Sequence, residues 1–161
     1  MIYVTVGTDQ HPFDRLLRAV DELLAAGRIT GPAMAQIGYS TYEPQNMEWF
    51  RFADYGKVVS YHRDAKIIIC HGGVGSILLA LQHGKRPVVV PRQAKFGEHI
   101  NDHQVRLAAR LHELSKVVAV SDMNLLPDAI NSARNSRMRI YTSNLATHLV
   151  SKYLEKARDS I

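Results

Sequence analysis

The chain has 161 residues, of which 46% are apolar and 22% are charged, with ten glycines and six prolines. This balance is typical of a globular domain and excludes disordered, collagen-like and coiled-coil chains. A chain of this length buries roughly two-thirds of its unfolded surface in one core, so it needs no metal or disulfide to fold. We therefore expect a single domain over residues 1–161.

Cys70 is the only cysteine, so no internal disulfide can form, and a cytoplasmic location fits best. The first residues carry neither the basic region nor the cleavage site of a signal peptide, and no apolar run approaches the ~20 residues of a membrane span. Twenty basic against fifteen acidic residues give a net charge of +5, and residues 132–161 hold six basic against two acidic residues. This basic end could face phosphate groups, anionic lipid or an acidic partner, or it is simply a solvated helix face.

Apolar runs of strand length alternate with helical patterns along the chain. In the first half of the chain, the sequence predicts a strand over 2–6 and a helix that begins at Pro12 and ends at Gly27. It then predicts strands over 33–37 and 48–52, and a helix from Asp54 to about 65. The second half predicts strands over 67–70, 88–90 and 117–120, each followed by a helix. These helices cover 77–83, about 99–113, and a segment that begins near 125 after a cap at Ser121 or Asp122; a last helix covers about 139–158. The alternation predicts an α/β fold, a Rossmann-like doubly wound parallel sheet of about six strands.

Three unusual loops follow predicted strands directly, at the carboxyl edge where ligands of open parallel sheets bind. They are Gly7-Thr8, residues 71–76 and residues 92–104. The second reads His-Gly-Gly-Val-Gly-Ser, and its glycines let the backbone approach a ligand closely. The free N–H groups and positive dipole end of the following helix favour an anion. The loop predicts a phosphate cradle, with a tight strand-to-helix turn that binds nothing as the alternative.

Other glycine-rich sites do not match this loop. A dinucleotide fingerprint needs glycine where Leu78 stands, and an ATPase phosphate loop needs glycine at Leu79 and a hydroxyl residue at Arg86. A hydrolase nucleophile elbow needs glycines two residues either side of Ser76, which Val74 and Leu78 do not provide. The residues at these positions therefore exclude all three kinds of site.

Three segments together resemble a known family: His71-Gly72-Gly73-Val74-Gly75-Ser76, then Gly84 with Val88-Val89-Val90-Pro91, then Glu98-His99-Ile100-Asn101-Asp102-His103-Gln104. They resemble the donor-nucleotide half of glycosyltransferase family 28, the C-terminal half of a GT-B fold. The resemblance extends from Ile2 to about Val120, and an extension through the last helix is left open. It is strongest to small, separately encoded subunits of two-component transferases that use UDP-sugars to make lipid-linked chitobiose or exopolysaccharide.

The resemblance implies roles for individual residues. Residues 71–76 would bind the donor diphosphate, Phe52-Ala53 would lie beside uracil, and Gly7-Thr8 would approach the phosphate or the sugar. His103 and Gln104 match the segment that holds sugar and ribose. Leu79 stands where related enzymes often place an acidic ribose ligand, so either Glu98 or Asp102 takes over that contact or nucleotide selectivity is weaker. The candidate substrate-binding residues are Gly7, Thr8, Phe52, Ala53, His71, Gly72, Gly73, Val74, Gly75, Ser76, Arg92, Glu98, His99, Asp102, His103 and Gln104.

Arg92 follows Pro91 at the predicted ligand edge. A departing nucleoside diphosphate needs charge stabilisation, which Arg92 could supply, or it could pair with a carboxylate on the sugar. The alternative is a surface salt bridge to Glu98 or contact with solvent. His99 and His103 are spaced like metal ligands, but no third ligand accompanies them, so we expect neither metal nor cofactor.

The length accommodates only the donor-side half of a two-domain transferase, so we expect the chain to be inactive alone. No catalytic residue is assigned on it, because the general base is expected on a partner. That partner would be a membrane-associated subunit that binds a lipid-linked acceptor and recruits this chain to the inner face of the membrane. The helix over about 139–158 is a candidate docking surface.

Two other classes of function are open. A non-catalytic regulatory or chaperone-like subunit would keep the nucleotide site without turnover. A nucleic-acid-binding module is suggested by the basic charge, but aromatic and basic residues interleave only over 49–52, so no nucleic-acid partner is expected. In the transferase reading, a bulky residue at Gly73 should block the nucleotide and leave the fold intact.

Overall fold

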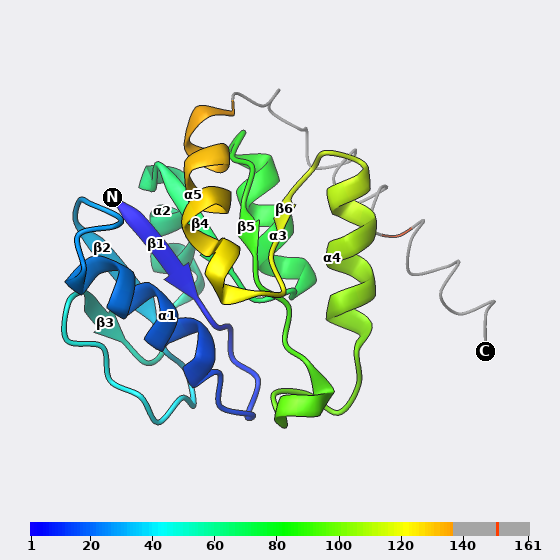
Figure 1. Ribbon diagram of the computed structural model, residues 1–161, viewed down its shortest axis with the longest axis horizontal. Coiled ribbons are helices and arrows are strands. Elements are labelled where there is room, and N and C mark those ends of the chain that lie inside the picture. The colour runs from blue at the N-terminus through cyan, green and yellow to red at the C-terminus, as the bar shows by residue number, and fades with distance from the viewer. Residues whose placement is uncertain (137–150, 152–161) are drawn as a thin grey trace.

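A computed structural model describes residues 1–136 and Ser151, and its sheet matches the predicted one. Six parallel strands lie in the order β3-β2-β1-β4-β5-β6 (Figure 1). They are β1 (Ile2–Thr5), β2 (Ala33–Gln36), β3 (Glu48–Phe50), β4 (Ile67–Cys70), β5 (Val88–Val89) and β6 (Val118–Ala119). The predicted α/β class with six parallel strands is confirmed.

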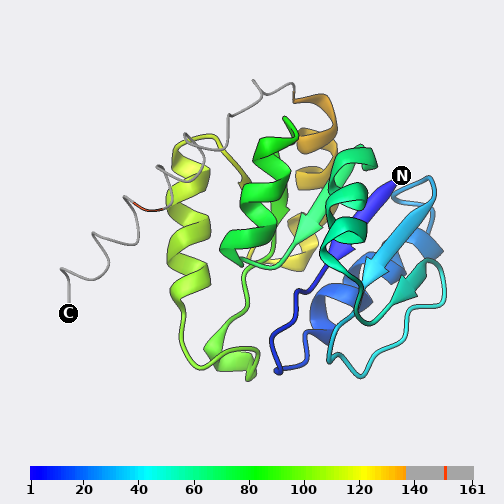
Figure 2. The ribbon, with the colours of Figure 1, turned by 180° about the vertical axis from the view of Figure 1, so that it is seen from behind.

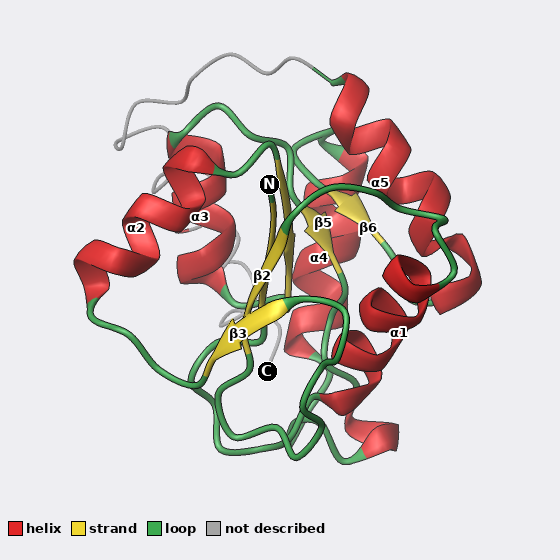
Figure 3. Cartoon of the chain, turned by 90° about the vertical axis from the view of Figure 1, so that its left-hand side faces the viewer, coloured by secondary structure: helices red, strands yellow, loops and turns green. Residues whose placement is uncertain are grey.

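Helices cover both faces of the sheet. They are α1 (Asp14–Ala25), α2 (Tyr55–Asp64), α3 (Val74–Gln82), α4 (His103–Glu113) and α5 (Leu126–Asn135), with 3-10 turns η1 (Ala94–Phe96) and η2 (Met123–Leu125). Figure 1 shows α1 and α5 in front of the sheet, and Figure 2 shows α2, α3 and α4 on the other face. Figure 3 views the sheet edge-on between these two layers. The fold is therefore a doubly wound, three-layer sandwich.

Two apolar cores lie on either side of the sheet because successive strand residues point to opposite faces. Val4 and Ile69 pack toward α1 and α5, whereas Tyr3, Ile68 and Cys70 pack toward α3 and α4. All four residues of β4 are buried, as its unbroken apolar run predicts for a central parallel strand. The strand order reverses between β1 and β4, and in open α/β sheets ligands bind at such a switch point.

Several element ends differ from the sequence prediction. The strand predicted over 48–52 ends at Phe50, and the helix predicted from 77 already begins at Val74. The helix predicted from about 99 begins only at His103, because Asn101 Oδ1 accepts a hydrogen bond from the His103 N–H in a local turn. Asp54 caps α2 as predicted, by accepting from the Lys57 N–H at 2.9 Å.

The basic C-terminal helix predicted over about 139–158 lies outside the described residues, apart from Ser151. Within residues 1–136, no helix combines the length and the apolar character that crossing a bilayer requires. In the same part of the chain, no group of three or more His, Cys, Asp or Glu side chains is arranged to hold a metal ion.

Candidate functional site

An open pocket of about 410 Å³ lies at the carboxyl ends of β1 and β4, beside the N-terminus of α3. Its lining residues are Gly7, Thr8, Gln36, Ala53, Tyr55, Val58, His71, Gly75, Ser76 and Leu79. The pocket thus brings together residues from the loops after β1, β3 and β4, which the sequence singled out, with residues from β2, α2 and α3. It sits at the switch point of the sheet, where a ligand is expected.

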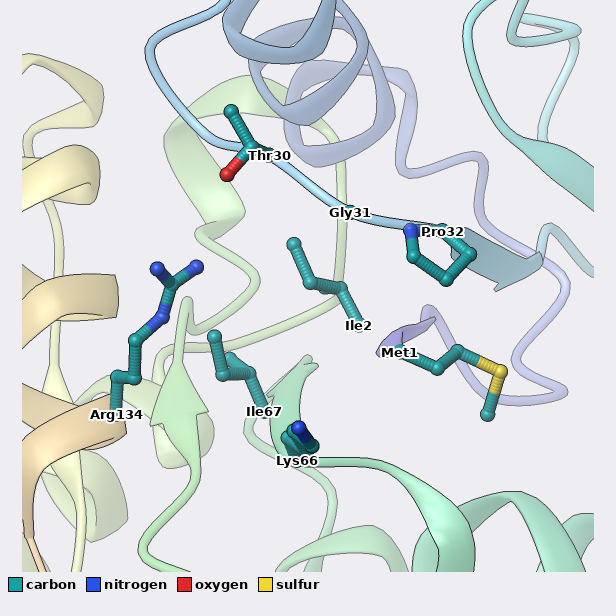
Figure 4. Close-up of a pocket in the computed structure, with 8 residues that line it drawn as sticks. All are labelled: Met1, Ile2, Thr30, Gly31, Pro32, Lys66, Ile67 and Arg134. Carbon is teal, nitrogen blue, oxygen red and sulfur yellow. The ribbon is translucent and has the colours of Figure 1, made fainter.

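A second pocket, of about 290 Å³, opens at the opposite edge of the sheet (Figure 4). It is lined by Met1, Ile2, Thr30, Gly31, Pro32, Lys66, Ile67 and Arg134. Most of these residues lie at the amino ends of β1, β2 and β4, away from the loops that carry the glycine motif, and Arg134 belongs to α5. We therefore take the pocket beside α3 as the candidate site.

The imidazole of His71 forms the floor of the candidate site between two glycines. Its backbone N–H donates to the Thr5 carbonyl at 3.1 Å, and Nδ1 lies 3.3 Å from the same oxygen. A carbonyl only accepts, so Nδ1 carries the hydrogen and Nε2 is left as an acceptor. A Cβ on Gly7 would lie 2.5 Å from His71 Cε1, and one on Gly73 would overlap Nε2. Both glycines are therefore required by the packing of the His71 ring.

Burial determines the charge of His71. It lowers the pKa of the ring to about 4, and the positive charge of Arg92 acts in the same direction. The imidazole is therefore neutral near pH 7. The N-terminus of α3 can attract an anion into this pocket, because Gly75 and Ser76 lie in its first turn and the N-cap Gly73 offers no side chain to the N–H groups.

Gln104 ties the loops after β4 and β5 together. Its Oε1 accepts from the Gly72 N–H at 3.1 Å and from the Arg92 N–H at 3.2 Å. A Cβ on Gly72 would lie 2.6 Å from Gln104 Cβ, which explains why glycine stands there. Gln104 thus holds the glycine loop in place.

Arg92 is completely buried, which corrects the expectation that it faces a ligand or forms a surface salt bridge. Its guanidinium donates to the backbone carbonyls of Val6 at 2.8 Å, His11 at 2.6 Å and Glu98 at 3.0 Å. It also lies over the Phe13 ring, 4.8 Å from the centroid. Its five donors can satisfy several carbonyls of converging loops at once, so the arginine serves as a tie between the loops.

Glu98 pairs with a residue that sequence reasoning did not consider. Arg15, on α1, holds both carboxylate oxygens through Nε at 2.7 Å and Nη2 at 2.8 Å. The Gln93 N–H adds a third bond at 3.0 Å. Because this carboxylate is buried and engaged, it is poorly placed to replace the acidic ribose ligand missing at Leu79.

The remaining predicted residues do not line the pocket. Phe52 is exposed and packs edge-on against Tyr39, with ring centroids 5.0 Å apart. Asp102 Oδ1 accepts from the Ala94 N–H at 2.9 Å. The predicted residues that the structure leaves out of the pocket lining are Phe52, Gly72, Gly73, Val74, Arg92, Glu98, His99, Asp102, His103 and Gln104.

Sequence reasoning missed Gln36, Tyr55 and Val58 as lining residues. Gln36 is a buried polar residue at the carboxyl end of β2, where its Oε1 accepts from Thr5 Oγ1 at 3.0 Å. A polar side chain that ends a short apolar strand was the available signal. Tyr55 is 73% exposed at the start of α2. It stands two positions after Phe52-Ala53, the segment predicted to lie beside uracil, so its aromatic ring was a signal for a lining residue.

Comparison with known proteins identifies a family. The model of the glycosyltransferase family 28 C-terminal domain matches residues 1–159. The human protein named UDP-N-acetylglucosamine transferase subunit ALG13 is 35% identical over 125 residues. That alignment covers 70% of this chain but 10% of the human protein, so this chain spans about a tenth of its relative.

Solved structures of glycosyltransferases share the fold. The glycotransferase of kitacinnamycin superposes with a TM-score of 0.64 at 20% identity, over 84% of this chain and 35% of that one. The calicheamicin glycosyltransferase CalG4 gives 0.61 at 18% identity, over 97% and 43%. The expected equivalence to one half of a GT-B glycosyltransferase is confirmed at the level of the fold.

Alanine substitutions at Gly73 and Gly75 should distinguish a glycine that packing requires from a glycine that faces open space. Gly73→Ala should lower the free energy of unfolding by about 1–3 kcal/mol, because its Cβ overlaps the His71 ring. Gly75→Ala meets nothing within 4 Å and should be neutral or slightly stabilising, since alanine favours the helix. Urea unfolding measures both, and equal stabilities would contradict the wedged position of His71.

Removing the Arg92 guanidinium should destabilise the fold strongly. Arg92→Met leaves three carbonyls without their donor, and buried unpaired groups cost about 1–3 kcal/mol each, so we expect a loss of about 3 kcal/mol or more. Arg63→Met is the control, because that side chain is exposed and should change stability by less than about 0.5 kcal/mol. Similar unfolding midpoints for the two variants would refute the role of Arg92 as a tie.

Acid should weaken the fold through His71. In the unfolded chain the ring gains a proton near pH 6.5, whereas in the fold its pKa is about 4. The unfolded state then binds more protons, so the free energy of unfolding falls as pH drops from about 6.5 toward about 4, by as much as about 3 kcal/mol.

His71→Gln should lack this part of the pH dependence in urea unfolding at a series of pH values. Burial also lowers the pKa of His62. Because both proteins contain His62, its contribution to the pH dependence cancels in the comparison. Parallel pH profiles for the two proteins would show that the ring is not held neutral by the fold.

Proposed function

This chain belongs to glycosyltransferase family 28 and matches the C-terminal domain of that family, and on that premise we propose that it binds a UDP-sugar as the donor subunit of a two-component sugar transferase. The observation that carries the proposal is the glycine loop that leads into α3 at the wall of an open pocket of about 410 Å³. A helix N-terminus with room for a ligand above it suits the diphosphate of a nucleotide.

The diphosphate lies over Gly75 and Ser76, where the N–H groups of the first turn and the Ser76 hydroxyl donate to its oxygens. The uracil lies toward Ala53 and Tyr55 at the other end of the lining. Leu79 lines the pocket where relatives are expected to carry an acid, and Glu98 is engaged by Arg15. The ribose therefore has weaker acidic recognition here, and selectivity among nucleotides is correspondingly low.

Bond cleavage between sugar and phosphate places negative charge on the departing diphosphate. The fixed amide dipoles of α3 stabilise that charge without reorganising. Arg92 adds a buried positive charge behind His71, close enough to lower the pKa of that ring. It therefore acts on the diphosphate through space, while its own hydrogen bonds stay with the loops.

A second chain supplies the acceptor side of the reaction. The human relative is named as a subunit of a UDP-N-acetylglucosamine transferase, which supports an assembly of this kind. In this proposal the partner is membrane-associated, binds a lipid-linked acceptor of polysaccharide synthesis, provides the general base and holds this chain at the cytoplasmic face of the membrane.

Calorimetric titration with UDP tests the nucleotide site. Gly75→Leu should weaken UDP binding at least about tenfold, or ~1.4 kcal/mol, because the side chain enters the pocket while the position itself has space for it. Asn131→Leu adds a similar side chain to an exposed position of α5, on the other face of the sheet, and should leave the affinity unchanged.

Equal affinities for Gly75→Leu and the unsubstituted chain would contradict the assignment. Gly73 is unsuitable for this experiment, because a side chain there collides with His71 and perturbs the fold as well as the pocket. UDP binding without sugar transfer in the presence of any acceptor subunit would instead indicate the non-catalytic regulatory role.

A further inference from the structure

Asp9, His11 and His99 form a small polar cluster beside the candidate site, which the proposed function leaves unused. We call these three residues the Asp9 cluster. His11 Nδ1 lies 2.6 Å from Asp9 Oδ1, and His99 Nε2 lies 3.9 Å from Asp9 Oδ2. All three side chains remain partly exposed, at 33% for Asp9, 29% for His11 and 20% for His99. The cluster is therefore open to a ligand.

Hydrogen bonds determine which atoms of the cluster donate and which accept. The His11 backbone N–H donates to Asp9 Oδ1 at 2.9 Å, and because a carboxylate only accepts, His11 Nδ1 also carries a hydrogen toward it. In the neutral imidazole this leaves His11 Nε2 as an acceptor. His99 Nδ1 accepts from the Asn101 N–H at 3.3 Å, so His99 Nε2 is a donor. The cluster thus offers two acceptors, His11 Nε2 and Asp9 Oδ2, and one donor.

The cluster lies where the sugar of the proposed donor would extend. Asp9 and His11 follow directly after Gly7 and Thr8, which line the pocket, and His99 comes from the loop after β5. The loops after β1 and β5 lie side by side at the lower edge of Figure 1, and Arg92 from the second loop donates to the His11 carbonyl of the first at 2.6 Å. With uracil toward the end of β3 and the diphosphate over α3, the sugar continues toward β5, and this placement rests on the proposed function.

Electrostatic coupling supports this proximity to the pocket. The negative charge of Asp9 raises the pKa of the His71 ring on the pocket floor, and His99 lowers it, both as minor contributions beside burial. The cluster and the pocket floor therefore lie within electrostatic reach of each other.

Asp9 keeps its negative charge. Burial alone would raise the pKa of its carboxyl. The hydrogen bonds from His11 and the charge of Arg92 together lower the pKa by more than burial raises it, so it lies below its ordinary value. Among the described arginines, Arg92 donates to backbone carbonyls and Arg15 pairs with Glu98. A ligand that reaches the cluster therefore meets an ionised carboxylate.

We propose that the Asp9 cluster selects the donor sugar, accepting hydrogen bonds from the hydroxyl groups of a neutral hexose and rejecting a uronic acid. Sugar hydroxyls can donate to Asp9 Oδ2 and His11 Nε2. A sugar carboxylate has no hydrogen to donate there, and its charge is repelled by Asp9. Specificity of this kind arises from like-charge repulsion as much as from attractive contacts.

Titration of the full chain with UDP, UDP-glucose and UDP-glucuronate near pH 7.5 tests the inference. UDP-glucuronate should bind roughly tenfold more weakly than UDP-glucose. Asp9→Asn should narrow that ratio at least threefold and leave the affinity for UDP unchanged. Asp64→Asn is the matched control, because it removes the same charge from an exposed residue at the C-terminus of α2 and should leave the ratio unchanged.

A second variant tests the acceptor role of His11. His11→Ala should weaken UDP-glucose about three- to tenfold and UDP not at all, because one hydrogen bond to the sugar is lost. The contact with Arg92 survives in this variant, since Arg92 binds the backbone carbonyl of residue 11. Unchanged thermal unfolding should accompany the altered affinity.

Three results would overturn the inference. UDP-glucuronate that binds as tightly as UDP-glucose, a ratio unaffected by Asp9→Asn, or equal losses for UDP and UDP-glucose in His11→Ala would each contradict sugar selection by the cluster. In each of these cases UDP still binds, so the proposed donor site stands. Failure of the unsubstituted chain to bind UDP would instead overturn the proposed function and this inference together.

Discussion

The buried guanidinium of Arg92 is the constraint on which the ligand edge depends. The loops after β1 and β5 leave the sheet with carbonyl groups that point inward, and Arg92 satisfies those of Val6, His11 and Glu98. Burying a cation is costly unless its hydrogen bonds are made, so the arginine and the loop conformations stabilise each other. This single side chain places the Asp9 cluster and contributes to the electrostatic environment of His71.

The glycines of the loop after β4 serve packing more than ligand approach. Gly73 makes room for the His71 ring and Gly72 for the Gln104 side chain, whereas Gly75 alone among the three faces open space. The ring in turn needs Gly7 on its other side, where the positive φ of 74° also favours glycine. A motif that suggests a phosphate cradle therefore has two components: a packed base and one open position at the start of α3.

Charge at the site is distributed so that fixed dipoles, rather than mobile cations, would attract an anion. His71 is held neutral, while Arg15 and Arg92 are engaged by carboxylate and carbonyl oxygens within the protein. The ionised Asp9 lies in the loop after β1, within electrostatic reach of His71. Such an arrangement is suited to a ligand with an anionic middle and a neutral, hydroxyl-rich end.

The sequence by itself determined the sheet and placed the glycine loop after β4 at its carboxyl edge. The apolar run Ile67–Cys70, followed by Gly-rich sequence, is typical of a strand buried on both faces, and ligands of open parallel α/β sheets bind at the carboxyl edge where the Gly-rich turn follows it. Only the tertiary structure decided which side chains line the pocket and which are buried beside it. Arg92 turned inward and Glu98 found Arg15 on α1, 83 residues away in sequence, because buried charges need partners that local spacing does not reveal.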